Sequence, residues 1–265
     1  MSAAKKSLGQ NFLRNPRTIC KIIEFGRIKP GEPLLEIGPG KGALTSLLLE
    51  SSDDLIAVEL DADLARQSLV PLFEKFPRAR LYIEDIRSFD PRKIPYFGRR
   101  KLFGNLPYYV ATHLVTEFAD PQQRQFFSEM IVMVQKEVAE RIWAKPGSKE
   151  YGYLSCICQL AYQVEKGFTV SPDAFYPRPK VDSMVLRLVP RVPRPDEEEF
   201  WKLLKEVLKQ AFGQRRKTIQ NNLKGTRFDL SALAEAEISP RARAEEIPLE
   251  NYVRLAQILA TNERV

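Results

Sequence analysis

The chain has 265 residues, of which 44% are hydrophobic, and a formal net charge of +7. This size provides for one large domain, or one large and one small domain, with a core of its own. No apolar run approaches the roughly 18 residues that a membrane span needs, and the first residues lack the apolar stretch of a signal peptide. We therefore expect a soluble, cytoplasmic protein without a membrane partner.

Histidine and cysteine are scarce. His113 is the sole histidine, and the three cysteines are Cys20, Cys156 and Cys158. These residues are too few for a disulfide framework or for the ligands of a zinc site. They also argue against a histidine-based catalytic triad and against a metal centre with several histidine ligands. We expect no metal site.

The N-terminal region combines basic and polar residues with an apolar pair, Phe12-Leu13. Asn15-Pro16 resembles a helix start, and isoleucines at positions 19, 22 and 23 form an apolar helical stripe. The sequence Lys29-Pro30-Gly31 ends this predicted helix.

A predicted strand at 33–37 runs into a glycine turn at 38–42, followed by leucines at helical spacing. This order is typical of the opening of a Rossmann-like unit, in which Gly38 and Gly40 let the backbone approach a ligand. The next predicted strand, 55–59, ends in Glu59, which is 21 positions after Gly38. This is the spacing at which a carboxylate binds ribose hydroxyls. Because Gly38, Gly40 and Ala43 also fit the dinucleotide pattern, this stretch alone leaves NAD open.

Two further predicted strands end in polar residues. The strand at 79–83 precedes Asp85, and the strand at 101–103 leads to Asn105. The carboxyl ends of parallel strands share one edge of an α/β sheet, where ligands bind. Glu59, Asp85 and Asn105 are therefore predicted to meet in one site.

The segment Asn105-Leu106-Pro107-Tyr108 precedes a helical pattern at 111–118. Pro107 restricts the backbone on both sides, so the carbonyls of Leu106 and Pro107 are held in fixed directions. Together with the amide oxygen of Asn105 and the ring of Tyr108, they suit a planar base that carries an exocyclic amine.

The middle of the chain predicts a strand at 130–134, helices at 135–143 and 154–162, and strands at 163–170 and 184–189. The loop before the last strand holds Phe175, Arg178 and Lys180 among prolines. Such a loop can present a ring to a flipped-out base and positive charges to phosphates.

A proline-rich linker at 190–195 precedes helical periodicity that continues to the end, with Ser239-Pro240 as a predicted helix start. We expect an α/β fold: a Rossmann-like domain at 1–190 and a small all-helical domain at 191–265. No acidic residue stands between Glu206 and Asp229, where the basic residues are Lys209, Arg215, Arg216, Lys217, Lys224 and Arg227. Together with a shorter cluster, Arg99-Arg100-Lys101, this placement favours a polyanionic partner.

The motifs together resemble those of the ribosomal RNA adenine N6,N6-dimethyltransferases. The matching stretches run along nearly the whole chain: 9–13, 36–42, 58–61, 105–108, 175–183 and 212–218. The resemblance implies a Rossmann-like fold and S-adenosylmethionine as the cofactor. It implies that the cofactor-binding residues are Asn11, Leu13, Gly38, Gly40, Glu59, Asp85 and Asn105.

The resemblance also implies which residues bind the target adenine. Asn105, with the carbonyls of Leu106 and Pro107, would orient the target amine, and Tyr108 and Phe175 would sandwich the adenine. RNA contacts would come from Arg178, Lys180, Arg215, Arg216 and Lys217. The implied reaction forms N6,N6-dimethyladenosine at two adjacent adenosines near the 3′ end of small-subunit rRNA within the assembling 30S subunit. We expect the protein to act as a monomer.

Three alternatives stand beside this interpretation. One is a macrolide-resistance-type methyltransferase that acts on large-subunit rRNA, and another is a non-catalytic ribosome assembly factor that kept the fold. The third, a nicotinamide-dependent dehydrogenase, lacks an evident proton donor and leaves the basic helical region unexplained.

Overall fold

The computed structural model describes residues 10–94, 97–106, 108–192, 197–226, 228 and 230–262, except for the side chains of Lys93, Tyr108 and Tyr109. The chain forms two compact units. Unit 1 comprises Met1–Val115, Gln125–Ala139 and Gln163–Pro190, and unit 2 comprises Thr116–Arg124, Glu140–Tyr162 and Arg191–Val265. Unit 2 thus contains the whole region expected to be helical, together with two earlier segments.

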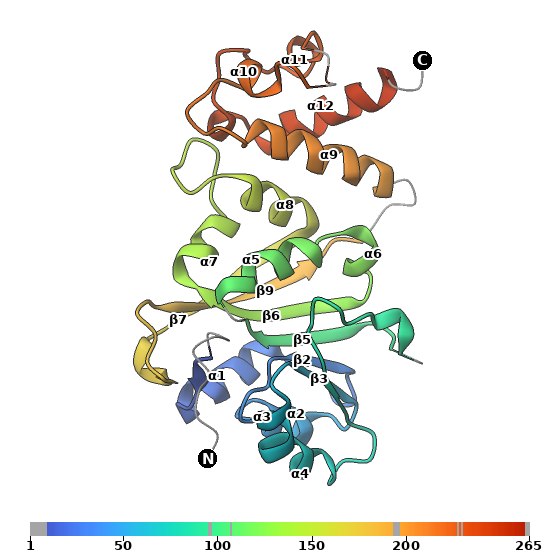
Figure 1. The fold of residues 1–265 in the computed structure, drawn as a ribbon, viewed down its shortest axis with the longest axis vertical. Coiled ribbons are helices and arrows are strands. Elements are labelled where there is room, and N and C mark those ends of the chain that lie inside the picture. Colours follow the sequence, from blue (N-terminus) through green and yellow to red (C-terminus); the bar gives the residue numbers. More distant parts are fainter. Residues whose placement is uncertain are drawn as a thin grey trace. The chain divides into compact units, whose positions relative to one another are not determined.

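The centre of unit 1 is a mixed sheet (Figure 1). In the described part of the chain it has seven strands, in the order β4-β3-β2-β5-β6-β9-β7. The strands are β2 (Leu34–Ile37), β3 (Leu55–Glu59), β4 (Arg80–Ile83), β5 (Arg100–Asn105), β6 (Phe127–Gln135), β7 (Tyr162–Val170) and β9 (Ser183–Pro190). From β4 to β6 neighbouring strands are parallel, whereas β9 is antiparallel to β6. This is the expected Rossmann-like α/β architecture.

A separate two-stranded sheet joins the N-terminal segment to the proline-rich loop. Its strands are β1 (Phe12–Leu13) and β8 (Phe175–Tyr176), which run antiparallel. This pairing was not predicted, because neither two-residue strand has a periodicity that could be recognised.

The first helix, α1 (Pro16–Gly26), follows its sequence signals closely. The side chain of Asn15 accepts a hydrogen bond from the backbone N–H of Thr18 at 3.0 Å, and Pro16 occupies the first helical position. The other helical elements of unit 1 are α2 (Thr45–Ser51), α3 (Ala62–Leu64), η2 (Ala65–Leu69), α4 (Val70–Phe73), η3 (Pro91–Lys93) and η4 (Pro172–Ala174). The helix α5 (Tyr108–Glu117) begins in unit 1 and ends in unit 2, and so does α7 (Lys136–Ile142).

One face of the sheet packs into the main core of unit 1. Leu34, Leu55, Phe103 and Ile131 supply this face, and the cluster also contains side chains of α1, α2, η2 and α4. Register places these strand residues on the same side, because side chains in a strand alternate between faces. Glu36, Glu59 and Asn105 lie on this same face, so the packed core beside them fixes their positions.

Of the basic cluster at 99–101, Arg99 is exposed, whereas Arg100 and Lys101 are buried. Arg100 and Lys101 lie in β5 with 4% and 1% of their surface exposed. Arg100 pairs with Asp54 at 2.8 Å, and Lys101 pairs with Glu32 at 2.9 Å while donating to the carbonyl of Gly26 at 2.8 Å. Their charges are thus neutralised within unit 1 and do not mark a polyanion-binding surface.

Unit 2 is helical in its described part. Its helical elements besides the ends of α5 and α7 are α6 (Pro121–Arg124), α8 (Tyr153–Ala161), α9 (Glu197–Ala211), α10 (Ile219–Leu223), α11 (Ala232–Glu235), η5 (Ala244–Glu246) and α12 (Leu249–Asn262). Arg124 is 1% exposed and pairs with Glu197 at 2.6 Å, which ties α6 to α9. The helix start predicted at Ser239-Pro240 is wrong, because a turn occupies these residues and α12 begins at Leu249. None of the helices in the described part of the chain combines the length and apolar character that crossing a bilayer requires.

Candidate active site

A pocket of unit 1 opens at the carboxyl ends of β2, β3 and β5. Of the candidate residues, it is lined by Asn11, Leu13, Gly38, Gly40, Glu59, Asp85, Asn105 and Leu106. Sequence reasoning did not assign a role to several others that line it: Gln10, Phe12, Glu36, Lys41, Leu60, Glu84 and Val110. Their signal was their proximity in sequence to the predicted motifs, which does not reveal which side chains face a cavity.

Strand register explains why three polar side chains meet there. Glu36 of β2 is in register with Ala57 of β3 and with Phe103 of β5. Glu59 and Asn105 lie two residues further along, on the same face and at the carboxyl edge of the sheet. The site is therefore the polar end of the face whose remainder forms the core.

The glycine turn and Glu59 are joined by hydrogen bonds. The backbone N–H of Gly40 donates to Oε2 of Glu59 at 2.9 Å, and that of Asp61 donates to Oε1 at 2.9 Å. Gly40 has a φ of +60°, and a Cβ at this position would lie 3.1 Å from the ring of Phe12. Burial raises the pKa of Glu59 above its ordinary value, although these two N–H donors act in the opposite direction. Glu59 is thereby fixed at the rim of the turn.

Glu36 lies beneath the same turn with 1% of its surface exposed. Its Oε2 atom is buried and makes no hydrogen bond. Burial raises the pKa of this carboxyl to about 8, with a further contribution from the charge of Glu59 and an opposing one from the hydroxyl of Thr45. A buried carboxyl with an unused acceptor is suited to interact with a cationic or hydrogen-bond-donating ligand.

Asp85 lies on the far side of the pocket after β4. Its carboxylate accepts hydrogen bonds from the Nε of Arg87 at 3.1 and 3.0 Å and from the backbone N–H of Arg87 at 2.9 Å. The Arg87 guanidinium lowers the pKa of Asp85, which keeps the carboxylate ionised. An ionised carboxylate at the pocket wall is an acceptor for a ligand amine.

The amide of Asn105 is oriented by the N-terminal segment. Its Nδ2 atom donates to the backbone carbonyl of Asn11 at 3.1 Å, so its Oδ1 atom remains the acceptor. Leu106 follows with its backbone N–H bonded to the carbonyl of Met133 at 3.1 Å. Pro107 lies outside the described residues, and Tyr108 is described only as the first residue of α5.

Phe175 does not reach this pocket. It is 1% exposed and belongs to the core cluster of unit 1, because β8 turns this side chain inward opposite Leu13. The structure therefore differs from the expectation that the loop presents the Phe175 ring to a base. The ring that the loop exposes is Tyr176, which is 60% exposed.

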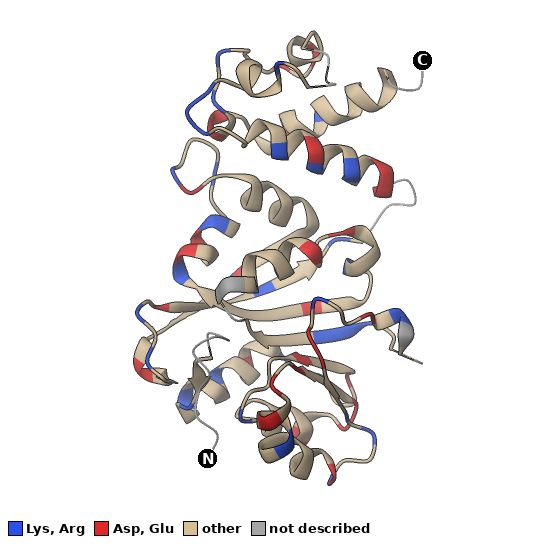
Figure 2. Ribbon diagram, in the orientation of Figure 1, with Lys and Arg blue, Asp and Glu red and all other residues tan. Residues whose placement is uncertain are grey.

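The candidate RNA-contacting residues fall on both units. Arg178 and Lys180 are exposed in the loop after β8, where Arg178 pairs with Asp173 at 3.2 Å. Arg215, Arg216 and Lys217 are exposed on the segment between α9 and α10, which is marked by blue in Figure 2.

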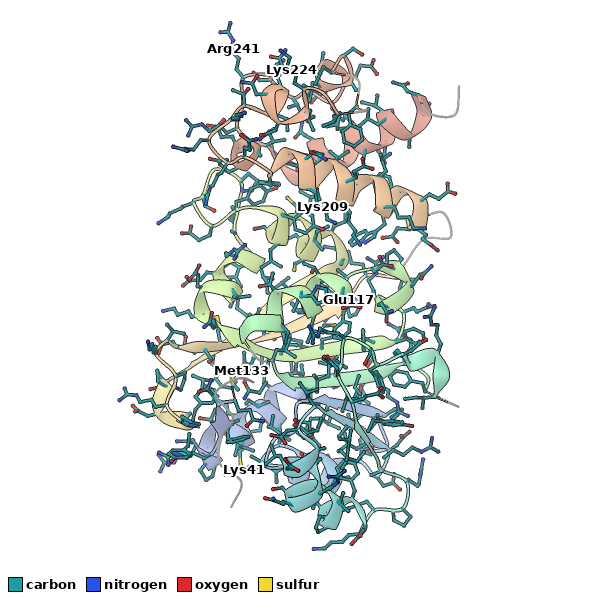
Figure 3. All side chains as sticks on the ribbon, in the orientation of Figure 1. Lys41, Glu117, Met133, Lys209, Lys224 and Arg241 are labelled. Carbon is teal, nitrogen blue, oxygen red and sulfur yellow. The ribbon has the colours of Figure 1, made fainter. Side chains whose placement is uncertain are left out.

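Unit 2 adds basic residues that the sequence clusters did not indicate. The Arg215 guanidinium donates a hydrogen bond to the backbone carbonyl of Lys149. The backbone N–H of Gly147 donates to the carbonyl of Glu245 at 2.7 Å, and the backbones of Thr218 and Arg243 form an isolated antiparallel β-bridge. These contacts bring together three segments distant in sequence. We call the result the basic surface of unit 2, which comprises Lys145, Lys149, Arg215, Arg216, Lys217, Arg241 and Arg243, all exposed. Figure 3 shows the labelled side chain of Arg241 projecting away from the ribbon.

No group of three or more histidine, cysteine, aspartate or glutamate side chains in the described residues could hold a metal ion. Cys156 and Cys158 are buried, and burial raises the pKa of the Cys156 thiol to about 12. These thiols are thus protonated and belong to the packing of unit 2.

Comparison with known proteins gives a consistent result. The family model "Ribosomal RNA adenine dimethylase" matches residues 1–261. Ribosomal RNA small subunit methyltransferase A of Methylococcus capsulatus is 43% identical, with 96% of this chain and 97% of that protein covered. The protein of the same name from Geobacter metallireducens is 40% identical, with coverages of 97% and 95%.

Two solved structures are similar over almost their whole length. A dimethyladenosine transferase from Plasmodium falciparum has a TM-score of 0.78 at 25% identity, with 96% of this chain and 98% of that chain covered. The 23S rRNA methyltransferase ErmE has a TM-score of 0.69 at 25% identity, with coverages of 94% and 100%.

Proposed function

The chain belongs to the ribosomal RNA adenine dimethylase family, and we propose that it dimethylates N6 of two adjacent adenosines near the 3′ end of 16S rRNA, with S-adenosylmethionine as the methyl donor. The observation that carries this proposal is the position of Asn105. Its amide nitrogen is held by the Asn11 carbonyl, and its oxygen is left as an acceptor at the pocket.

The composition of the pocket fits this cofactor. The carboxylates of Glu59, Glu84 and Asp85 line it, together with the protonated carboxyl of Glu36 and the ammonium of Lys41. S-adenosylmethionine carries a sulfonium and an ammonium, which an acidic wall attracts, whereas the pyrophosphate of NAD would be repelled by the same carboxylates. The acidic wall therefore favours a methyl donor over a dinucleotide.

The cofactor roles follow from the places of the residues. Asn11, Leu13 and Gly38 would contact the methionine end, while Gly40 would give the backbone close access. Glu59 would accept from the ribose hydroxyls and Asp85 from the adenine amine, since both carboxylates line the pocket. When bound, the cofactor supplies an electrophilic methyl group.

The protein's contribution to the transfer is orientation. Adenine N6 is a poor nucleophile because its lone pair is delocalised into the ring. Acceptors at Asn105 Oδ1 and at the carbonyl of Leu106 or Pro107 would bind the N6 hydrogens and favour a pyramidal nitrogen. Holding two reactants in line can contribute on the order of 7–11 kcal/mol, so the site needs no strong base.

The stacking partner of the target adenine is proposed to be Tyr108, at the start of α5. Phe175 contributes by packing: its burial in the core fixes β8 against β1, and β1 supplies Leu13 to the pocket. This role replaces the aromatic sandwich inferred from the motif.

The basic surface of unit 2 is proposed to bind the rRNA backbone, because its lysines and arginines are exposed and can pair with phosphates. Arg178 and Lys180 would add contacts beside the target. The proposed partner is the assembling 30S subunit, on which the protein acts as a monomer.

One other substrate has an observation in its favour. The ErmE likeness is compatible with action on large-subunit rRNA. The relatives named for the small subunit are 38–43% identical over nearly the whole chain, which favours the small-subunit substrate.

The proposal is tested by incubating the protein with radiolabelled S-adenosylmethionine and, in parallel, unmodified small subunits, large subunits and naked rRNA. We expect label on small subunits, recovered as N6,N6-dimethyladenosine. Label on large subunits alone would establish the resistance-type reaction instead. Binding to small subunits without label in any reaction would identify a non-catalytic assembly factor.

A further inference from the structure

The sheet formed by β1 and β8 carries two aromatic rings on one face. Phe12 and Tyr176 are directly opposite each other in its register, and opposite residues of an antiparallel pair point to the same side. Leu13 and Phe175 form the other opposite pair and are buried in the core cluster. The alternation therefore directs one pair inward and the other pair outward.

The two residues of the outward pair have different surroundings. Phe12 lines the cofactor pocket, whereas Tyr176 is 60% exposed. The ring of Tyr176 thus lies one strand away from the pocket wall, on a backbone that the buried Phe175 holds in place.

Each of these rings has a cation beside it. The guanidinium of Arg14 lies 5.7 Å from the ring centroid of Tyr176, and the ammonium of Lys41 lies 4.9 Å from that of Phe12. Arg14 and Lys41 are exposed, and Lys41 is labelled in Figure 3. We call Phe12, Tyr176, Arg14 and Lys41 the aromatic ribbon.

A ring with an adjacent cation matches a nucleotide. A nucleobase can stack on the ring while the cation binds the neighbouring phosphate, and this combination is typical of surfaces that bind single-stranded RNA. The exposed loop residues Arg178 and Lys180 extend the positive charge, and the acid Asp173 is paired with Arg178. This excess of positive charge favours a polyanion over an apolar protein surface.

We propose that the aromatic ribbon binds the unpaired nucleotide next to the target adenosine, with its base stacked on Tyr176 and its phosphate at Arg14. This inference rests on the proposed function. When the target base enters the pocket, the neighbouring nucleotide remains at the pocket rim. There Tyr176 lies directly opposite Phe12, which lines the pocket. The ribbon thereby selects RNA in which the flanking nucleotide is free to unstack.

The experiment compares Tyr176→Leu, Tyr176→Trp and Arg14→Gln with the wild type, using unmodified small subunits as the substrate. Base stacking on one aromatic side chain corresponds to roughly a 5- to 150-fold change in affinity. We expect Tyr176→Leu to raise KM for small subunits within that range while kcat and the affinity for S-adenosylmethionine stay unchanged. Tyr176→Trp should retain the wild-type KM, and Arg14→Gln should raise KM and reduce its dependence on salt.

Two controls separate this role from a structural one. Val181→Ala removes an exposed apolar side chain of the same loop and should leave every parameter unchanged, and thermal unfolding should show that Tyr176→Leu folds normally. Unchanged KM in Tyr176→Leu would overturn the inference, and so would a loss of kcat or of cofactor affinity. Absence of transfer by the wild type would refute the proposed function itself, so the two failures are distinguishable.

Discussion

Glu36 is a carboxyl that the fold holds in its uncharged form at neutral pH. It is buried under the glycine turn, its pKa is raised to about 8 by burial, and one of its oxygens has no hydrogen bond. In an unfolded chain the same group has its ordinary pKa of 4.5. Because the folded protein retains a proton that the unfolded chain releases, stability is highest below the lower value and decreases as the pH rises to the higher one.

We therefore predict that Glu36→Gln is stabilised relative to the wild type at alkaline pH. The difference in the free energy of unfolding should be small near pH 4.5 and increase by up to roughly 1.4 kcal/mol per pH unit until about pH 8. Chemical denaturation at several pH values measures it, with the exposed Glu50→Gln as the control. A difference that does not depend on pH would show that Glu36 is ionised throughout.

At the scale of elements, β5 connects the core to the catalytic segment. A Cβ on Gly104 would lie 2.8 Å from Cδ2 of Leu106, which is 1% exposed. The absence of a side chain at Gly104 therefore allows the chain to turn Leu106 inward directly after Asn105.

Substitution of Gly104 by alanine should displace the Asn105 amide. A displacement of about 1 Å can reduce a rate on the order of a hundredfold, so we expect a large decrease in single-turnover methyl transfer with a smaller effect on cofactor binding. Gly152→Ala is the matched control, because no atom lies within 4 Å of its added Cβ. Equal rates for Gly104→Ala and the wild type would mean that Leu106 can repack without moving Asn105.

The other end of β5 depends on buried charges. Lys101 is contacted by Glu32 and Glu129, and it donates to the carbonyls of Gly26 and Arg27. Removal of one member of a buried pair leaves an uncompensated charge, so Lys101→Met should decrease the free energy of unfolding by about 3–5 kcal/mol.

The control for this prediction is Lys202→Met in α9. Lys202 pairs with Glu198, four residues earlier in the same helix, at the exposed surface. Because water and salt screen such a pair, its removal should change the free energy of unfolding far less than removal of the buried Lys101. Similar losses in the two variants, measured by urea denaturation, would contradict the view that β5 depends on its buried charges.

At the scale of the whole molecule, the basic surface of unit 2 should determine how affinity for rRNA depends on salt. Replacement of Arg215, Arg216 and Lys217 by glutamine should weaken binding. It should also decrease the slope of log affinity against log salt by roughly 0.7–0.9 for each phosphate contact removed. Filter binding at several salt concentrations measures both quantities. Lys202→Gln on α9 is the control, and an unchanged slope would place the rRNA contacts elsewhere.

The elements with strong local signals were predictable from the sequence. The strand, glycine turn and helix at 34–51, the acid at the end of β3 and the amphipathic α9 follow from periodicity and spacing. Arg100 and Lys101 were misjudged because a run of positive charges does not show that carboxylates from other segments will pair with it. The pairing of β1 with β8 depends on contacts between residues about 160 positions apart, which the pattern of one sequence does not encode.

The surface contribution of Lys145, Lys149, Arg241 and Arg243 was missed for the same reason. Each stands in a segment with acidic or apolar neighbours, and the segments come together only through tertiary contacts in unit 2. The last helix begins later than Ser239-Pro240 because the backbone N–H of Ala242 bonds to the carbonyl of Ser239 in a turn.

The role of Asn105 in methyl transfer is tested most directly by Asn105→Ala, assayed for transfer to unmodified small subunits and for binding of S-adenosylmethionine. We predict a folded protein that binds the cofactor with most of the wild-type affinity and forms no detectable dimethyladenosine. Because the Asn105 acceptor would be absent while Glu36, Glu59 and Asp85 remain, binding and transfer should separate. Normal turnover by Asn105→Ala would contradict the assignment of this pocket as the site of methyl transfer.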